Sequence, residues 1–107
     1  MEIKNARGTR DMSGTDAILQ QKIVSTLRSV FELYGFNPLQ TPILERLETL
    51  TSKYAGGEEI LKEVFKLKDQ GKRDLALRYD LTVPLARFIA INPNLKMPFK
   101  RYAIGSV

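Results

Sequence analysis

Residues 75–90, LALRYDLTVPLARFIA, read as a strand that continues directly into a helix. Leu75, Leu77 and Tyr79 alternate with other residues, which is the period of two expected of a strand. The alternation assigns Arg78 and Asp80 to the opposite face. Apolar residues then follow at the spacing of a helix, at Leu85, Phe88 and Ile89. A strand that feeds a helix without an intervening loop constrains the packing of both elements, and the rest of the chain must be arranged around this junction.

Polar side chains at the junction permit two interpretations. Asp80 or Thr82 can cap the helix, and Pro84 is tolerated in its first turn. In the simpler interpretation these residues only cap the helix, and Arg78 pairs with Asp80. In the second, the helix N-terminus stabilises the ionised carboxylate of Asp80. Together with the Thr82 hydroxyl, that carboxylate forms an acceptor pair for an ammonium group, which has three N–H donors. The pattern alone leaves both open.

Composition narrows the class of protein. The chain has 107 residues, enough for one domain with a single core. With 43% apolar and 27% charged residues, we expect a soluble globular protein, without a membrane segment or secretory signal, in the cytoplasm. The absence of cysteine and histidine argues against disulfides, thiolate catalysis and a structural zinc site. The net charge of +5 is compatible with RNA binding, and solubility explains it equally well.

The first third of the chain predicts a long helix followed by an edge strand. Ser13 and Asp16 match a capping box, and an apolar stripe predicts a helix over residues 15–34. Gly35 stands where a helix C′ residue belongs. Residues 37–44 alternate like a strand but contain two prolines, which favours an edge position. That edge could pair with a second subunit or be a protected edge in a monomer.

The remaining segments complete an α+β pattern. We expect a short helix over residues 45–54, a hairpin turn at 69–72, and strands at 63–68, 74–80 and 99–107. The predicted fold is a mainly antiparallel sheet packed against the long N-terminal helix. The last strand runs to the final residue, which suggests a chain cut from something longer or a natural truncation. Its exposed edge predicts marginal stability.

Five segments, in this order, carry a family resemblance. They are GTRD at 8–11, YGFNPLQTPILE at 34–45, KDQG at 68–71, LALRYDLTVPLARFIA at 75–90 and PFKRYAIGSV at 98–107. Together they resemble the N-terminal part of the catalytic domain of histidyl-tRNA synthetase, a class II aminoacyl-tRNA synthetase. The second segment resembles class II motif 1, and the last resembles the approach to motif 2. The resemblance spans residues 1–107 as part of one domain, from motif 1 to the start of motif 2.

The resemblance implies roles for particular residues. In this family the acidic residue and the threonine of the YDLT run hold the α-amino group of histidine, which here implicates Asp80 and Thr82. Arg78 is a possible support of that site. Motif 1 builds the family's homodimer interface, and it corresponds here to Tyr34, Gly35, Phe36 and Pro42. The resemblance assigns no catalytic residue and no metal ligand to these residues.

The implied parent activity is ATP-dependent activation of histidine and its transfer to tRNA-His. The complete enzyme would use ATP and Mg²⁺, but the family's motif 2 and motif 3 arginines and its anticodon-binding domain lie outside these residues. We therefore expect the 107-residue chain alone to be inactive and to bind no cofactor tightly. Two alternatives remain. One is a catalytically silent paralogue such as the regulatory subunit of ATP phosphoribosyltransferase, and the other is a stand-alone dimerisation module.

Overall fold

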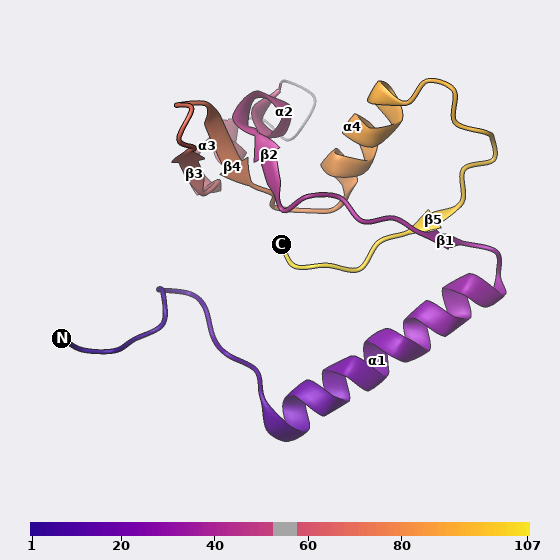
Figure 1. Cartoon of the computed structure of the whole chain (residues 1–107), viewed down its shortest axis with the longest axis horizontal. Coiled ribbons are helices and arrows are strands. Elements are labelled where there is room, and N and C mark those ends of the chain that lie inside the picture. Colours follow the sequence, from indigo (N-terminus) through magenta and orange to yellow (C-terminus); the bar gives the residue numbers. More distant parts are fainter. Residues whose placement is uncertain (53–57) are drawn as a thin grey trace. The chain divides into compact units, whose positions relative to one another are not determined.

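The computed structural model describes residues 1–52 and 58–107 and consists of two compact units, Met1–Phe36 and Asn37–Val107 (Figure 1). In the first unit, residues 1–13 are irregular and lead into helix α1 (Gly14–Leu33). Gly8 has a φ of +82° within a turn that the Thr9 N–H closes by donating to the Ala6 carbonyl at 3.0 Å. The long helix predicted over residues 15–34 is confirmed to within one residue at each end.

The C-terminal end of α1 is closed by a Schellman motif. The Gly35 N–H donates to the Glu32 carbonyl, and the Phe36 N–H donates to the Phe31 carbonyl, both at 3.0 Å. Gly35 has a φ of +84°, a left-handed conformation that a side chain would disfavour. The rings of Phe31 and Phe36 meet edge to face, with centroids 6.5 Å apart. The predicted C′ glycine is therefore confirmed, and it turns the chain sharply out of the helix.

The N-terminal end of α1 differs from the prediction. Ser13 is the N-cap residue, but its side chain makes no capping hydrogen bond, so the capping box with Asp16 is wrong. Gly14, the first helical residue, has a φ of +62°, which lies outside the helical region. We attribute the missing bond to this irregular first turn, because a cap requires the N–H groups of a regular turn to face the serine oxygen.

The second unit contains the sheets. Strands β2 (Leu44–Arg46), β4 (Asp74–Leu77) and β3 (Lys66–Lys68) form an antiparallel sheet in the order β2-β4-β3. A separate parallel pair joins β1 (Asn37–Pro38) to β5 (Arg101–Tyr102). The predicted α+β class and antiparallel sheet are confirmed, while the β1–β5 pair adds a parallel ladder that the sequence pattern did not predict.

Proline breaks the strand predicted over residues 37–44 into β1 and β2. Asn37 of β1 and Leu39, which follows β1, donate their N–H groups to carbonyl oxygens of the segment containing β5, at 3.0 and 2.9 Å. Pro38 lies between these two donors. It has no N–H, and its position is one that donates no hydrogen bond to the β5 segment, so the pairing is not weakened. Pro42 lies in the irregular segment between β1 and β2. The strand predicted over residues 99–107 is likewise limited to the two residues of β5.

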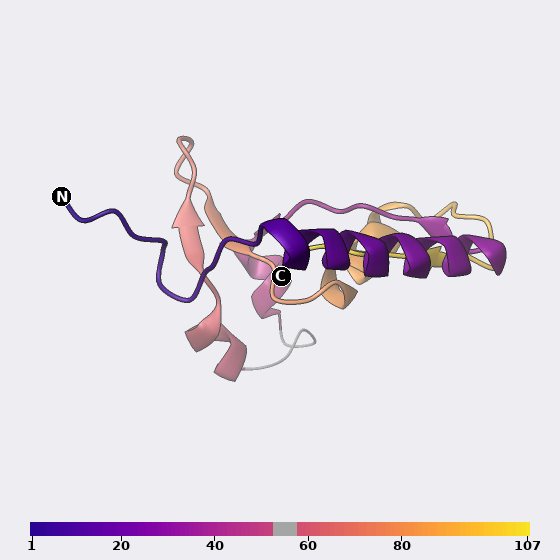
Figure 2. The same cartoon turned by 90° about the horizontal axis from the view of Figure 1, so that it is seen from below.

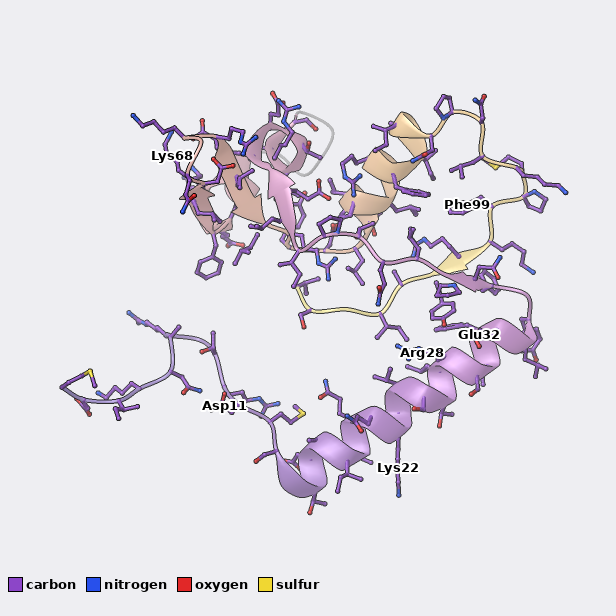
Figure 3. All side chains as sticks on the ribbon, viewed as in Figure 1. Asp11, Lys22, Arg28, Glu32, Lys68 and Phe99 are labelled. Atoms are coloured by element: carbon purple, nitrogen blue, oxygen red, sulfur yellow. The ribbon has the colours of Figure 1, made fainter. Side chains whose placement is uncertain are left out.

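The predicted turn at residues 69–72 joins β3 to β4 in a hairpin (Figure 2). The Lys72 N–H donates to the Asp69 carbonyl at 3.0 Å, and Lys72 itself has a φ of +61°. The Asp69 carboxylate accepts the backbone N–H of Arg73 at 2.9 Å and its Nε at 2.7 Å, and these bonds lower the pKa of Asp69. At the strand end, Lys68 (Figure 3) pairs with Asp74 at 2.8 Å. The hairpin is held by local polar contacts.

Three short helices accompany the sheet: α2 (Leu47–Thr51), α3 (Glu58–Glu63) and α4 (Thr82–Ile91). The helix predicted over residues 45–54 begins at Leu47, and residues 53–54 lie outside the described part. Leu50 of α2 is fully buried, as expected for an inward position. Phe88 of α4 stacks on Phe99, with ring centroids 5.8 Å apart (Figure 3). Among the described residues, no helix is long and apolar enough to cross a membrane.

A buried ion pair ties α4 to strand β2. Arg87 of α4 donates through Nε to the Oε1 of Glu45 at 2.9 Å, and the same nitrogen lies 2.9 Å from Oε2. The Glu45 side chain is 4% exposed and that of Arg87 is 24% exposed. A carboxylate removed from water requires its cation, since an unpaired buried charge is very costly. The pair therefore fixes the helix against the strand that follows Pro42.

Replacing Arg87 by methionine should strongly destabilise the protein, because Glu45 would lose its partner while remaining buried. We expect a loss of ~3 kcal/mol in the free energy of unfolding, measured by urea denaturation. Arg73→Met is the matched control, since its pair with Asp69 has an arginine side chain that is 77% exposed. The control substitution should lower the free energy of unfolding by less than about 1 kcal/mol. Equal losses in the two variants would contradict the structural role of the Glu45–Arg87 pair.

Candidate functional site

The junction between β4 and α4 consists of residues 78–81, and Asp80 caps the helix from within it. Its Oδ1 accepts the backbone N–H of Val83 at 3.1 Å. The neighbouring N-cap position, Leu81, has no side chain able to accept this bond. The predicted capping role of Asp80 is therefore confirmed, and it holds the carboxylate in the positive field of the helix N-terminus.

The capping bond leaves acceptor capacity on Asp80. Its Oδ2 accepts no hydrogen bond from any residue that the structure describes, and the side chain is only half-buried. An ionised carboxylate has roughly four lone-pair sites, so a cap consumes about one of them. Burial raises the pKa of the adjacent Tyr79, and the charge of Asp80 raises it further. With respect to the described residues, the junction thus presents a carboxylate with at least one oxygen that could accept a bond from a cation.

Thr82 lies on the open side of the junction, at the start of α4. It is exposed and lines a shallow depression of about 390 Å³ between α2 and α4, together with Thr49, Ser52 and Arg87. Asp80 is not among the described residues that line this depression. The structure therefore places the Thr82 hydroxyl on an accessible surface two residues beyond the capping carboxylate.

Arg78 has a different environment from the one proposed in the simpler sequence interpretation. It is 7% exposed, and its Nε donates to the Ser106 carbonyl at 2.9 Å. Its Nη1 donates to the Thr41 carbonyl at 2.9 Å and to the Thr41 Oγ1 at 3.3 Å. Within the described part of the chain Arg78 forms no ion pair with Asp80, so that predicted pairing is wrong. Backbone carbonyls that are distant in sequence satisfy the guanidinium instead.

The motif 1 residues fall in both units. Tyr34, Gly35 and Phe36 follow the last residue of α1, with Tyr34 as its C-cap, whereas Pro42 lies between β1 and β2. The apolar stripe of α1 is exposed along its length: the exposed fractions are 55% for Leu19, 52% for Ile23, 44% for Leu27 and 46% for Val30. The rest of its own unit, Met1–Phe36, therefore leaves much of the apolar stripe of α1 uncovered.

The basic residues of the hairpin do not converge on one site. Arg73 pairs with Asp69, and Lys68 pairs with Asp74, at 2.7 and 2.8 Å. A hollow of about 790 Å³ lies between this hairpin and α2, and its lining has charges of both signs. No group of three or more His, Cys, Asp or Glu side chains able to hold a metal ion occurs in residues 1–52 and 58–107. The hairpin charges are mostly satisfied by their neighbours.

Two contacts at or near the junction were not predicted from the sequence. The Glu45–Arg87 pair joins residues 42 positions apart. Gly105 lies so close to the Arg78 guanidinium that a Cβ built on it would be 2.6 Å from Nη2. A contact over such separations cannot be read from local periodicity, although a charged residue on an otherwise apolar face of a helix, as at Arg87, is a hint of a buried partner.

Comparisons with known proteins agree with the motif order. A family model described as Histidyl-tRNA synthetase matches residues 8–107. A relative named Histidine--tRNA ligase 1 from Bacillus anthracis is 54% identical over all 107 residues, which cover 25% of that protein. The chain thus spans about a quarter of the length of the curated relatives that it matches.

Solved structures extend the agreement to the fold. Histidyl-tRNA synthetase from Nostoc sp. PCC 7120 matches all of this chain and 24% of its own, with a TM-score of 0.86 and 33% identity. A protein described as an ATP phosphoribosyltransferase regulatory subunit/histidyl-tRNA synthetase from Bacillus halodurans C matches 87% of this chain and 24% of its own, with a TM-score of 0.67 and 26% identity. From the family match over residues 8–107, together with the ordered motifs and the shared fold, we conclude that this chain belongs to the histidyl-tRNA synthetase family.

Proposed function

We propose that these residues are the N-terminal part of the catalytic domain of a histidine–tRNA ligase, from motif 1 to the start of motif 2. The parent protein would activate histidine with ATP and transfer it to tRNA-His. The family match and the high identity to proteins named as histidine–tRNA ligases support this proposal. We also propose the cytoplasm, where tRNA is aminoacylated, as the location of the parent protein.

The observation that carries the proposal is the half-satisfied carboxylate of Asp80 at the start of α4. One oxygen caps the helix at 3.1 Å from the Val83 nitrogen, and the other accepts no hydrogen bond from the described residues. Thr82 adds an exposed hydroxyl on the same turn. A carboxylate and a hydroxyl are suitable acceptors for the ammonium group of a free amino acid. We propose that Asp80 and Thr82 bind the α-amino group of histidine.

Binding by its amino group would orient histidine for the activation step. In the parent enzyme a carboxylate oxygen of histidine would form a bond to the α-phosphorus of ATP, and the bond to pyrophosphate would break. No protein nucleophile is needed, so the contribution of Asp80 and Thr82 is positional. The residues described here offer no cluster suited to Mg²⁺, and we assign neither ATP nor the metal to any of them.

A catalytically silent paralogue is the second candidate. The structural similarity to the protein described as a regulatory subunit/histidyl-tRNA synthetase favours keeping this alternative. Such a protein would bind histidine through the same two side chains without forming an adenylate. A stand-alone dimerisation module, the third possibility, would need neither side chain. Chemistry on histidine distinguishes the ligase from the other two, and histidine binding distinguishes the silent paralogue from the dimerisation module.

The parent protein should catalyse histidine-dependent exchange of pyrophosphate into ATP, and a polypeptide of these 107 residues alone should not. The family's phosphate-binding arginines lie outside residues 1–107, and the developing charge on the phosphate needs such cations. Exchange of labelled pyrophosphate measures both proteins. Histidine binding without exchange by the parent protein would favour the silent paralogue. Exchange by the short polypeptide at the rate of the parent would overturn the assignment.

Asp80→Asn should raise the KM for histidine in the parent protein roughly 10- to 100-fold, because it removes a charge-assisted hydrogen bond of about 1.5–3 kcal/mol. Asparagine is also a good cap, so α4 should remain intact. The matched control is Asp69→Asn, which makes the same change in the β3–β4 turn and should leave the KM unchanged. If both variants keep the parent's KM, Asp80 does not contact the amino group.

We also propose that motif 1 forms a homodimer. The apolar stripe on α1 that includes Ile23 and Leu27 is left uncovered by the rest of its own unit, and covering it by a second copy would remove apolar surface from water. Tyr34, Gly35 and Phe36 at the end of α1, and Pro42 beyond it, are the motif positions that we expect near this interface.

Replacing Ile23 and Leu27 together by glutamine should shift the parent protein from dimer to monomer in sedimentation velocity. The matched control replaces Lys22 and Arg28 of α1 (labelled in Figure 3) by glutamine; both lie outside the apolar stripe, so the dimer should stay intact. Apolar burial drives the association, so the loss should be selective for the first pair. A parent protein that is monomeric at every concentration would contradict the motif 1 dimer.

A further inference from the structure

Arg78 joins three segments that are far apart in sequence. Its guanidinium donates to the carbonyls of Thr41 and Ser106, both at 2.9 Å. Its own backbone N–H donates to the Ile43 carbonyl at 2.9 Å, which continues the β2–β4 pairing beyond the last strand residue. All of these residues belong to the unit Asn37–Val107. Arg78 is therefore anchored through both its side chain and its backbone, two residues before Asp80.

Gly105 lies directly against the guanidinium of Arg78. A Cβ at position 105 would lie 2.6 Å from Nη2 of Arg78, closer than atoms can approach without movement. The φ of Gly105 is not in the left-handed region, so the backbone conformation does not require glycine there. Glycine is required because the guanidinium approaches the backbone so closely. An arginine head can usually swing away, but here three hydrogen bonds hold it in a residue that is 7% exposed.

The anchored arginine lies at one end of the junction, and the cap lies at the other. Asp80 accepts the Val83 N–H at 3.1 Å, which fixes the junction to α4. On the opposite side, the bonds of Arg78 fix it to residues 41–43 and 106. The Tyr79 hydroxyl adds a longer bond, 3.4 Å, to the Leu50 carbonyl. The direction in which Asp80 and Thr82 face therefore depends on Arg78 remaining in its place.

We propose that Arg78 and Gly105 act as a lock that positions Asp80 and Thr82 for the amino group of histidine. This inference rests on the proposed function. Arg78 is a positioning residue in this proposal, since its guanidinium is buried and donates to Thr41 and Ser106. Gly105 is required because it leaves room for the guanidinium. A lysine at position 78 has no planar fork and cannot donate to both carbonyls in the same geometry.

The test uses the parent protein with Arg78→Lys, Gly105→Ala and the double variant, and measures pyrophosphate exchange per folded active site. Each single variant should raise the KM for histidine about 10-fold, while kcat and the KM for ATP change less than about threefold. In the Arg78→Lys background, Gly105→Ala should add less than about twofold, because the atom that it clashes with is gone. Arg73→Lys, an exposed arginine in the hairpin, should leave all parameters unchanged.

The outcomes separate the lock from the proposed function. A parent protein without histidine-dependent exchange refutes the proposed function, and the lock as a positioning device with it. An active parent whose two single variants keep its KM for histidine refutes only the lock. Equal effects of Gly105→Ala in both backgrounds also refute it, because two independent sites would behave in that way. If Arg78→Lys does not fold, the KM for histidine of the Gly105→Ala variant alone tests the lock: an unchanged value refutes it.

Discussion

The guanidinium of Arg78 is the group on which the arrangement of the junction depends. A buried cation must have its N–H donors satisfied, because leaving them without partners costs several kcal/mol. Its acceptors are carbonyl oxygens of Thr41 and Ser106, at separations of 37 and 28 residues. The parallel pairing of β1 with β5 brings the segments that carry these carbonyls side by side (Figure 1). A single buried charge therefore links the strand after α1, the junction and the C-terminal segment.

Both local and long-range contacts hold Asp80 in its position. Its capping bond to Val83 is a contact within one turn. The helix that it caps is held in place from farther away, since Arg87 of α4 pairs with the buried carboxylate of Glu45 on β2. A carboxylate that only capped a helix would need no such anchoring of both its flanks. Anchoring on both flanks holds the carboxylate in one position, which is what the proposed binding of an ammonium group would require.

Features that depend on neighbouring residues could be predicted from the sequence. The long helix, the glycine that ends it, the turn at residues 69–72 and the cap by Asp80 all arise from interactions within about five positions. The capping box at Ser13 failed because the positive φ of Gly14 disturbs the first turn. The continuous strand over residues 37–44 failed because alternation of side chains says nothing of which N–H groups have partners.

The sequence by itself determined the local elements, the family resemblance and the candidate acceptors Asp80 and Thr82, because periodicity, caps and turns are set by short-range physics. Only the tertiary structure decided that Arg78 turns away from Asp80 toward Thr41 and Ser106, and that Gly105 makes room for it. The physical reason is that a buried guanidinium selects its acceptors by the geometry available in the folded chain. Arg78 therefore donates to carbonyl oxygens that the fold places within 3 Å, and not to the carboxylate of Asp80, which is near it in sequence.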